Sequence, residues 1–136
     1  MKGTQTYLNF DGQTRDAMTF YQKALGGKLD IMTFGDAHVP GAEGFENRIM
    51  HARLESGPLV LMASDTMPGM PFTKGNNFHI NIDCSSNDEQ DKLFSALGES
   101  GKVIMPLADQ FWGARFGMLT DRYGVNWMFN SELPKK

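Results

Sequence analysis

Two short segments of this chain carry hydrogen-bonding side chains at every second position, with mostly apolar residues between them. Amide, phenol and imidazole groups can hold a small polar molecule through directed hydrogen bonds, and an imidazole can also carry a proton or bind a metal. The residues concerned are Gln5, Tyr7 and Asn9 in the first segment, and Asn77, His79 and Asn81 in the second.

An indole ring and a guanidinium group follow further along the chain. Trp112 can form the wall of a pocket, and Arg115 can hold an anionic ring or a carboxylate. The alternative is structural: Trp112 seals the contact between two modules, and Arg115 pairs with Asp109 or Asp121. Both interpretations stay open at the level of sequence.

The rest of the chain excludes several kinds of chemistry and partner. There is no Ser/His/Asp series and no glycine-rich phosphate loop. The single Cys84 excludes an internal disulfide, and its alternation with Ile80 and Ile82 predicts a packed, inert thiol. A formal net charge of -3 without a basic cluster argues against nucleic acid. No segment resembles a signal peptide or a membrane span, so we expect no membrane partner and a cytoplasmic location.

The chain also contains an internal repeat. Leu8–Asp11 corresponds to Ile80–Asp83, and Ala24–Gly26 corresponds to Ala96–Gly98, both at a spacing of about 72 residues. A solenoid repeat runs only to roughly 20 to 50 residues, so the spacing indicates a duplicated half-domain instead. We expect a single domain over residues 1–136, made of two modules at about residues 1–66 and 74–134.

Hydrophobic periodicity gives each module a strand, a helix and three further strands. In the first module we expect strands at residues 4–10, 28–35, 48–55 and 59–63, and a helix at residues 14–25. In the second we expect strands at residues 77–83, 103–105, 114–121 and 125–130, and a helix at residues 87–97. Thr14 or Asp11 would cap the first helix, and Ser85 or Ser86 the second. The predicted class is α+β.

Side-chain alternation then predicts which residues meet. If the helices cover the apolar faces of the strands, the opposite faces line a cleft. Polar groups there would cost about 1–3 kcal/mol each without partners, so several of them indicate a wet pocket. In the strand at residues 48–55, Met50, Ala52 and Leu54 alternate with Ile49, His51, Arg53 and Glu55, which places His51 on a solvated or interface face, and we expect His38 in a loop. The predicted ligand contacts are Tyr7, Asn9, Asn77, His79, Asn81, Trp112, Arg115 and Met128.

Several motifs together resemble one known family. They are Tyr7–Gly12 before a helix with Phe20 and Tyr21, the strand Met50–Leu54, and above all Phe111–Gly117 followed by Thr120–Met128. This pattern resembles the PhnB-like branch of the vicinal oxygen chelate superfamily, the glyoxalase, bleomycin-resistance and extradiol-dioxygenase group. The resemblance covers nearly the whole chain. It implies two βαβββ modules that form a cupped mixed sheet, and a homodimer.

Enzymes of that superfamily hold a divalent metal with one ligand from the first and last strand of each module. The resemblance places Gln5 at the first ligand position. In the second module one alignment places His79 there, whereas the internal spacing that pairs Gln5 with Asn77 puts His79 two residues further on. The positions that normally carry Glu fall on Met128 and within residues 59–62, with Leu61 as the best match. Such a set is a poor site for Zn, Ni, Mn or Fe.

The missing carboxylates favour a protein that binds a small molecule in its cup, with a degenerate metal site and no certain cofactor. Within that interpretation, His79 either contacts the ligand or only lines the cup, hydrogen-bonded to Asn81 or Tyr7. The alternative function is a metal-dependent lyase, isomerase or dioxygenase of the vicinal oxygen chelate type. A structural or regulatory dimer with a vestigial cup is a third interpretation.

Overall fold

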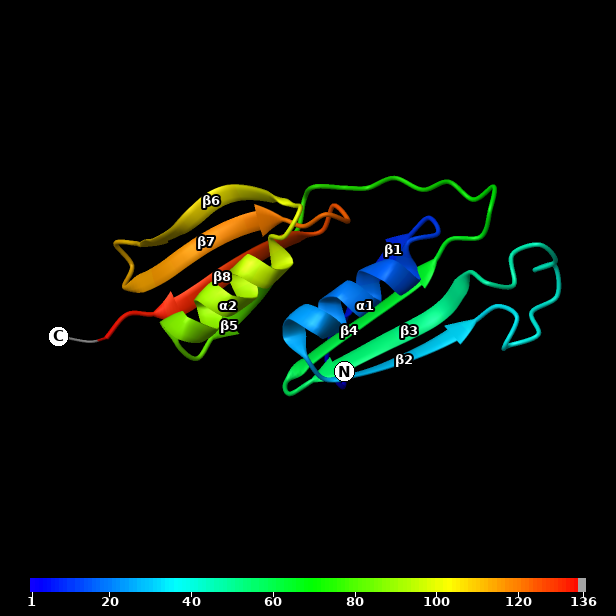
Figure 1. Ribbon diagram of the computed structural model, residues 1–136, viewed down its shortest axis with the longest axis horizontal. Helices are drawn as coiled ribbons and strands as arrows, with labels where there is room; N and C mark the ends of the chain where they lie inside the picture. The colour runs from blue at the N-terminus through cyan, green and yellow to red at the C-terminus, as the bar shows by residue number, and fades with distance from the viewer. Residues whose placement is uncertain (135–136) are drawn as a thin grey trace. The chain divides into compact units, whose positions relative to one another are not determined.

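The computed structural model describes residues 1–134, which divide into two compact units. Unit 1 is Met1–Thr73, and unit 2 begins at Lys74. Each unit contains one helix and one four-stranded sheet (Figure 1). Among the residues described, no helix is long and apolar enough to cross a membrane.

The order of elements is the same in both units. Unit 1 runs through β1 (Thr6–Phe10), α1 (Thr14–Leu25), β2 (Lys28–Thr33), β3 (Ile49–Ser56) and β4 (Leu59–Asp65). Unit 2 runs through β5 (Ile80–Cys84), α2 (Asn87–Leu97), β6 (Lys102–Asp109), β7 (Ala114–Thr120) and β8 (Asn126–Glu132). The predicted α+β class with two βαβββ modules is confirmed.

Both sheets are mixed, because the first strand of each unit pairs in parallel with the last. The strand order is β1-β4-β3-β2 in unit 1 and β5-β8-β7-β6 in unit 2. The pairs β1–β4 and β5–β8 are parallel, and the remaining pairs are antiparallel. In each unit the helix lies across one face of its sheet (Figure 1). The first and last strands of each unit therefore present their side chains next to one another.

The helix-covered faces form the cores of the units. In unit 1, Leu8, Phe10, Leu54 and Leu61 are buried beside Ala17, Met18 and Tyr21 of α1. In unit 2 the largest buried side chains are Trp127, Phe129, Leu119 and Leu97. Burial of one such large apolar side chain is worth about 1.5–3 kcal/mol.

One core residue lies on the opposite face from the predicted one. Alternation placed Ile49 with His51 and Arg53, but the structure leaves Ile49 only 1% exposed. The pairing of β2 with β3 shifts, so that Met32 lies opposite His51 whereas Thr33 lies opposite Ile49. The extra residue, Met50, forms a β-bulge, and a bulge reverses the alternation beyond it.

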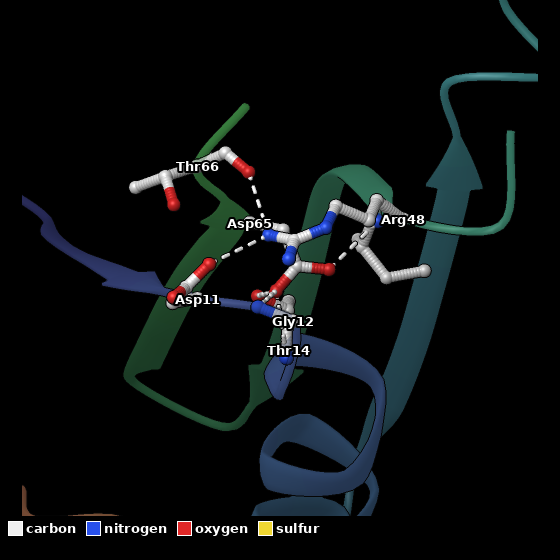
Figure 2. Close-up of polar contacts among 7 residues, drawn as sticks. Asp11, Gly12, Thr14, Arg48, Asp65 and Thr66 are labelled. Carbon is white, nitrogen blue, oxygen red and sulfur yellow. Dashed lines mark hydrogen bonds and ion pairs between the residues drawn. The ribbon is translucent and has the colours of Figure 1, made fainter. Parts of the chain in front are cut away.

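The start of α1 is held by a strand from elsewhere in unit 1 (Figure 2). Asp65 at the end of β4 is 6% exposed, and its Oδ1 accepts from the backbone N–H of Gly12 at 2.9 Å. The same oxygen accepts from the backbone N–H of Thr14 at 3.0 Å and from its hydroxyl at 2.8 Å. Asp65 Oδ2 accepts from the N–H of Ile49 at 2.9 Å. The expected cap by Thr14 or Asp11 is therefore wrong, since Asp65 caps the helix.

Arg48 reinforces the same corner of unit 1. Its Nη1 donates to Asp11 Oδ1 at 2.9 Å and to the carbonyl of Thr66 at 2.8 Å (Figure 2). These bonds tie the turn after β1 to the segment that follows β4. In unit 2 the predicted local cap is confirmed, because the Ser86 hydroxyl accepts from the N–H of Glu89 at 3.1 Å.

Candidate functional site

Each sheet has a second face, turned away from its helix, which we call the open face of that unit. Its side chains are exposed or half-buried and include Tyr7, Asn9 and Asn81, three of the polar residues that the sequence singled out. On β1, β3 and β4 the open face of unit 1 carries Tyr7, Asn9, His51, Arg53, Met62 and Ser64. On β5, β7 and β8 the open face of unit 2 carries Asn81, Asp83, Phe116, Met118, Met128 and Asn130.

A phenol and an imidazole meet on the open face of unit 1. Tyr7 lies opposite Met62, and its side chain reaches past β4, so that its hydroxyl lies 3.2 Å from Nδ1 of His51. The two ring centroids are 5.8 Å apart. The expectation that His51 lies on a solvated face agrees with its half-buried position, but its pairing with Tyr7 was missed.

Arg53 lies on the same face, two residues after His51. Its Nε donates to Glu55 Oε1 at 2.7 Å, and its Nη1 lies 3.9 Å from the sulfur of Met62. The guanidinium group therefore extends over β4 towards β1. Because the Glu55 and Arg53 side chains are both substantially exposed, this ion pair contributes little to stability.

The open face of unit 2 joins amides to an aromatic cluster. Asn81 lies opposite Met128, and Asn130 Nδ2 donates to Asp83 Oδ1 at 3.1 Å. Asn130 also lies opposite Phe116, whose ring centroid is 5.7 Å from that of Trp112. Trp112 belongs to the turn before β7 and is 51% exposed. It therefore borders the open face through Phe116.

Arg115 lies on the other side of this sheet. Its Nη2 is 2.8 Å from Asp91 Oδ1, and its Nη1 donates to Gln90 Oε1 at 3.4 Å, with both partners on α2. The buried Gln90 returns a 2.8 Å bond to the carbonyl of Arg115. The guanidinium group is thus turned to α2, because Arg115 alternates with Phe116, and its partner is Asp91 rather than Asp109 or Asp121. This placement does not support a ligand contact by Arg115 on the open face.

Asn77 and His79 both precede β5 and are exposed. Strand register decides which of them corresponds to Gln5, which precedes β1. The β1–β4 pairing ends at Phe10 opposite Asp65, and the β5–β8 pairing ends at Cys84 opposite Ser131. Asp65 and Ser131 each bond to the first residue of the helix in their unit. Asp65 accepts from the N–H of Thr14, and the Ser131 hydroxyl donates to Asn87 Oδ1 at 3.0 Å.

Phe10 therefore corresponds to Cys84, and the residue that corresponds to Gln5 is His79. This offset is two residues longer than the one that the sequence repeat indicates. One residue comes from the connection between strand and helix, which spans residues 11–13 in unit 1 and residues 85–86 in unit 2. The other comes from the helix, because α1 has 12 residues and α2 has 11.

The same registers correct the position expected for the fourth-strand ligand. Leu61 lies opposite Thr6, has no exposed surface and belongs to the core of unit 1. Met62 lies opposite Tyr7 on the open face, as Met128 lies opposite Asn81 in unit 2. The two positions that carry Glu in the metal-binding pattern are therefore both methionines in this chain.

This donor set does not fit a divalent metal of the expected kind. Unit 1 offers an amide and a thioether, and unit 2 an imidazole and a thioether. Hard divalent cations prefer oxygen ligands, and zinc prefers nitrogen, thiolate or carboxylate, so a neutral thioether is a poor replacement for a glutamate. Within residues 1–134, no group of three or more His, Cys, Asp or Glu side chains is placed to hold a metal ion.

The cysteine of this chain is not prepared for nucleophilic chemistry. Burial raises the pKa of the Cys84 thiol to about 11, and the negative charges of Glu89 and Asp83 add to the effect. A thiol with such a pKa holds its proton at neutral pH and is a weak nucleophile.

Two βαβββ units with mixed sheets are the fold of the vicinal oxygen chelate superfamily. A protein from Nocardioides, described as a glyoxalase/bleomycin resistance protein/dioxygenase, has this fold with a TM-score of 0.59. At 20% identity, with 100% of this chain and 87% of that one covered, the likeness concerns the fold alone.

Within that class the chain belongs to the PhnB-like family, whose model is described as 3-demethylubiquinone-9 3-methyltransferase and matches residues 2–129. The crystal structure of protein PA1353 from Pseudomonas aeruginosa is 42% identical, with a TM-score of 0.84 over 97% of this chain and 100% of that one. A PhnB protein from Bacillus cereus is 27% identical, with a TM-score of 0.74 over 96% and 99%. The resemblance seen in the sequence motifs is thereby confirmed.

Proposed function

We propose that this chain binds a small organic molecule on the open face of a unit and does so without a divalent metal. The observation that carries the proposal is the pair Met62 and Met128, which stand in equivalent registers where metal-dependent relatives need carboxylates. The surrounding side chains are amides, rings and thioethers, which suit a partly apolar organic ligand. The proposed contacts are Tyr7 and Asn9 on unit 1, and His79, Asn81 and Trp112 on unit 2.

Metal analysis tests the metal-free part of the proposal. The protein is purified without chelator, analysed for bound metals and titrated with zinc, nickel and manganese by calorimetry. We expect no stoichiometric binding. One equivalent of any of these metals, bound more weakly after Gln5→Ala or His79→Ala, would overturn the metal-free proposal and favour the metal-dependent lyase, isomerase or dioxygenase alternative.

Thermal-shift screening tests the ligand-binding part. A ligand that binds only the folded state raises its stability, by about 2.7 kcal/mol at a concentration of one hundred times its Kd. The screen covers aromatic acids, quinones, adducts of methylglyoxal with thiols, and antibiotics. His79→Ala should weaken binding of the best hit, whereas His38→Asn, in an exposed turn, should not. Equal affinity of the two variants would refute the assignment of His79.

The family description names a methyltransferase, but the sequence has no methyl-donor motif, and methylation forms no part of the proposal. A cytoplasmic location and a homodimer do form part of the proposal. The homodimer is included because members of the superfamily commonly pair. Light scattering at micromolar concentration checks the dimer, and a mass of one chain, 15.2 kDa, would exclude it.

A further inference from the structure

We propose that the open face of unit 1 binds the carboxylate of a small aromatic acid, with Tyr7, His51 and Arg53 as the recognition group and a methionine on either side of the ring. The inference rests on the proposed function and deepens it by naming a ligand class. Sequence alternation predicted only that His51 lies on a solvated or interface face. Its place in the recognition group comes from the strand register.

The hydrogen-bond donors have a spacing that suits a carboxylate. His51 and Arg53 are two residues apart on one face of β3, and alternate residues of a strand lie about 7 Å apart. When the Tyr7 hydroxyl donates to Nδ1 of His51 across their 3.2 Å contact, the imidazole proton resides on Nε2. Nε2 is then a donor held in a fixed orientation by the phenol.

Arg53 supplies the charge. Its Nε is bonded to Glu55, while its Nη1, placed beside Met62, and its Nη2 carry further N–H groups. These groups form the planar fork that recognises a carboxylate through two parallel bonds. Because His51 and Arg53 are alternate residues on one face of β3, we infer that one carboxylate can accept from both side chains.

The charges around these donors are compatible with an anion. On β2, Lys28 pairs with Asp30 at 3.9 Å, and on β3 Arg53 pairs with Glu55. The open-face residues of β1 and β4 are Tyr7, Asn9, Val60, Met62 and Ser64, none of which carries a negative charge. Asp30 also lies opposite Arg53, so the two carboxylates of β2 and β3 are matched by the two cations Lys28 and Arg53. An incoming acid therefore shares Arg53 with the exposed Glu55, through the N–H groups that Glu55 leaves free.

The apolar component of the site favours an aromatic ring. Met62 lies opposite both Tyr7 and Arg53, and Met32 lies opposite His51 and is 45% exposed. Thioethers make favourable contacts with aromatic rings and adapt to rings of different shape. These two side chains flank β3 from β2 and from β4, so a ring whose carboxylate lies at His51 and Arg53 would lie between them.

The experiment compares benzoate with benzamide, which has nearly the same shape but no charge. Both are titrated into protein carrying ¹³C-methyl methionine, and the methyl resonances are followed by NMR. We expect benzoate to shift Met32 and Met62 in a saturable manner, at an affinity at least about tenfold above that of benzamide. Met18, a fully buried residue of α1, serves as the internal control and should not shift.

Variants identify the recognition group. Arg53→Gln should weaken benzoate binding by about tenfold or more, and Tyr7→Phe by about threefold, because the phenol orients His51 without carrying the charge. His51→Gln should fall between them. His38→Asn is the matched control, since its backbone φ of 52° is tolerated by asparagine, and it should bind benzoate as the parent does.

The possible failures are distinguishable. Equal affinity for benzoate and benzamide, or undiminished benzoate binding by Arg53→Gln, overturns this inference while leaving metal-free ligand binding intact. Shifts confined to Met118 and Met128 overturn it as well, since they place the acid on unit 2. Stoichiometric metal binding in the earlier titration overturns the proposed function whatever benzoate does.

Discussion

The bonds of Asp65 lead to the sharpest stability prediction. Replacement of Asp65 by alanine removes the acceptor for Gly12, Thr14 and Ile49 at a position that is 6% exposed. Three backbone N–H groups lose their partner at once. Three parts of unit 1, the turn after β1, the start of α1 and the start of β3, lose their common attachment to β4.

The magnitude follows from the individual terms. A buried N–H left without a partner costs about 1–3 kcal/mol, and a lost N-cap costs about 1 kcal/mol. Water can reach Gly12, which is exposed, so the two buried residues, Thr14 and Ile49, dominate. We expect Asp65→Ala to lower the free energy of unfolding of unit 1 by about 3–5 kcal/mol, a large share of the roughly 5–15 kcal/mol that a domain possesses.

Urea unfolding measures this loss, and the chain offers separate probes for its units. Its two tryptophans, Trp112 and Trp127, both belong to unit 2, so their fluorescence reports that unit, whereas far-UV circular dichroism reports both. Asp83→Ala is the control, because Asp83 is exposed and accepts a bond from the side chain of Asn130. If Asp65→Ala lowers the free energy of unfolding by an amount within about 0.5 kcal/mol of that control, Asp65 is not the residue that holds these three segments of unit 1 together.

Two further predictions concern backbone space and the thiol. Gly27→Ala should destabilise unit 1 by more than about 2 kcal/mol in the same assay, because Gly27 has φ +91° and an added Cβ would meet the carbonyl of Glu55. Gly57→Ala is the control: Gly57 has φ +56° but open space around it, so this variant should lower the free energy of unfolding by only about 1 kcal/mol. A larger loss in Gly57→Ala would contradict this. Cys84 should react slowly with iodoacetamide at pH 7.5 and faster as the pH approaches about 11. Because the folded state holds the thiol proton more tightly than the unfolded state, the contribution of Cys84 to stability should be present below about pH 9 and vanish as the pH rises through about 11. Rapid labelling of the folded protein at neutral pH would show that the thiol is not protected.

The helices were predictable because their signals are local. Apolar periodicity and a glycine after each helix gave residues 14–25 and 87–97, which are the bounds of α1 and α2. β6 was predicted over residues 103–105 but spans Lys102–Asp109. It is an edge strand with mostly exposed side chains, contains Pro106 and is interrupted by two register shifts, so it lacks the alternation that identifies a strand.

The candidate site was predictable only where strand alternation sufficed. Alternation placed Tyr7, Asn81 and Met128 on one kind of face, and the registers agree with that grouping. It could not supply pairs that depend on which strands are neighbours. Tyr7 contacts His51 across β4, and Arg115 forms an ion pair with Asp91 on α2. Such pairs follow from sheet order and register, which local sequence does not encode.

The position of His79 shows how much depends on that register. The repeat in the sequence matches Leu8–Asp11 with Ile80–Asp83 and Leu25 with Leu97 at one common offset of about 72 residues. That offset holds at the helix ends but misassigns the strands, because unit 1 has a longer connection and a longer helix, which together shift the strand register by two residues. A shift of two residues keeps a side chain on the same face, so alternation cannot detect it. The bonds of Asp65 and Ser131 to the first helical residues detect it, and they place His79 rather than Asn77 at the position of Gln5.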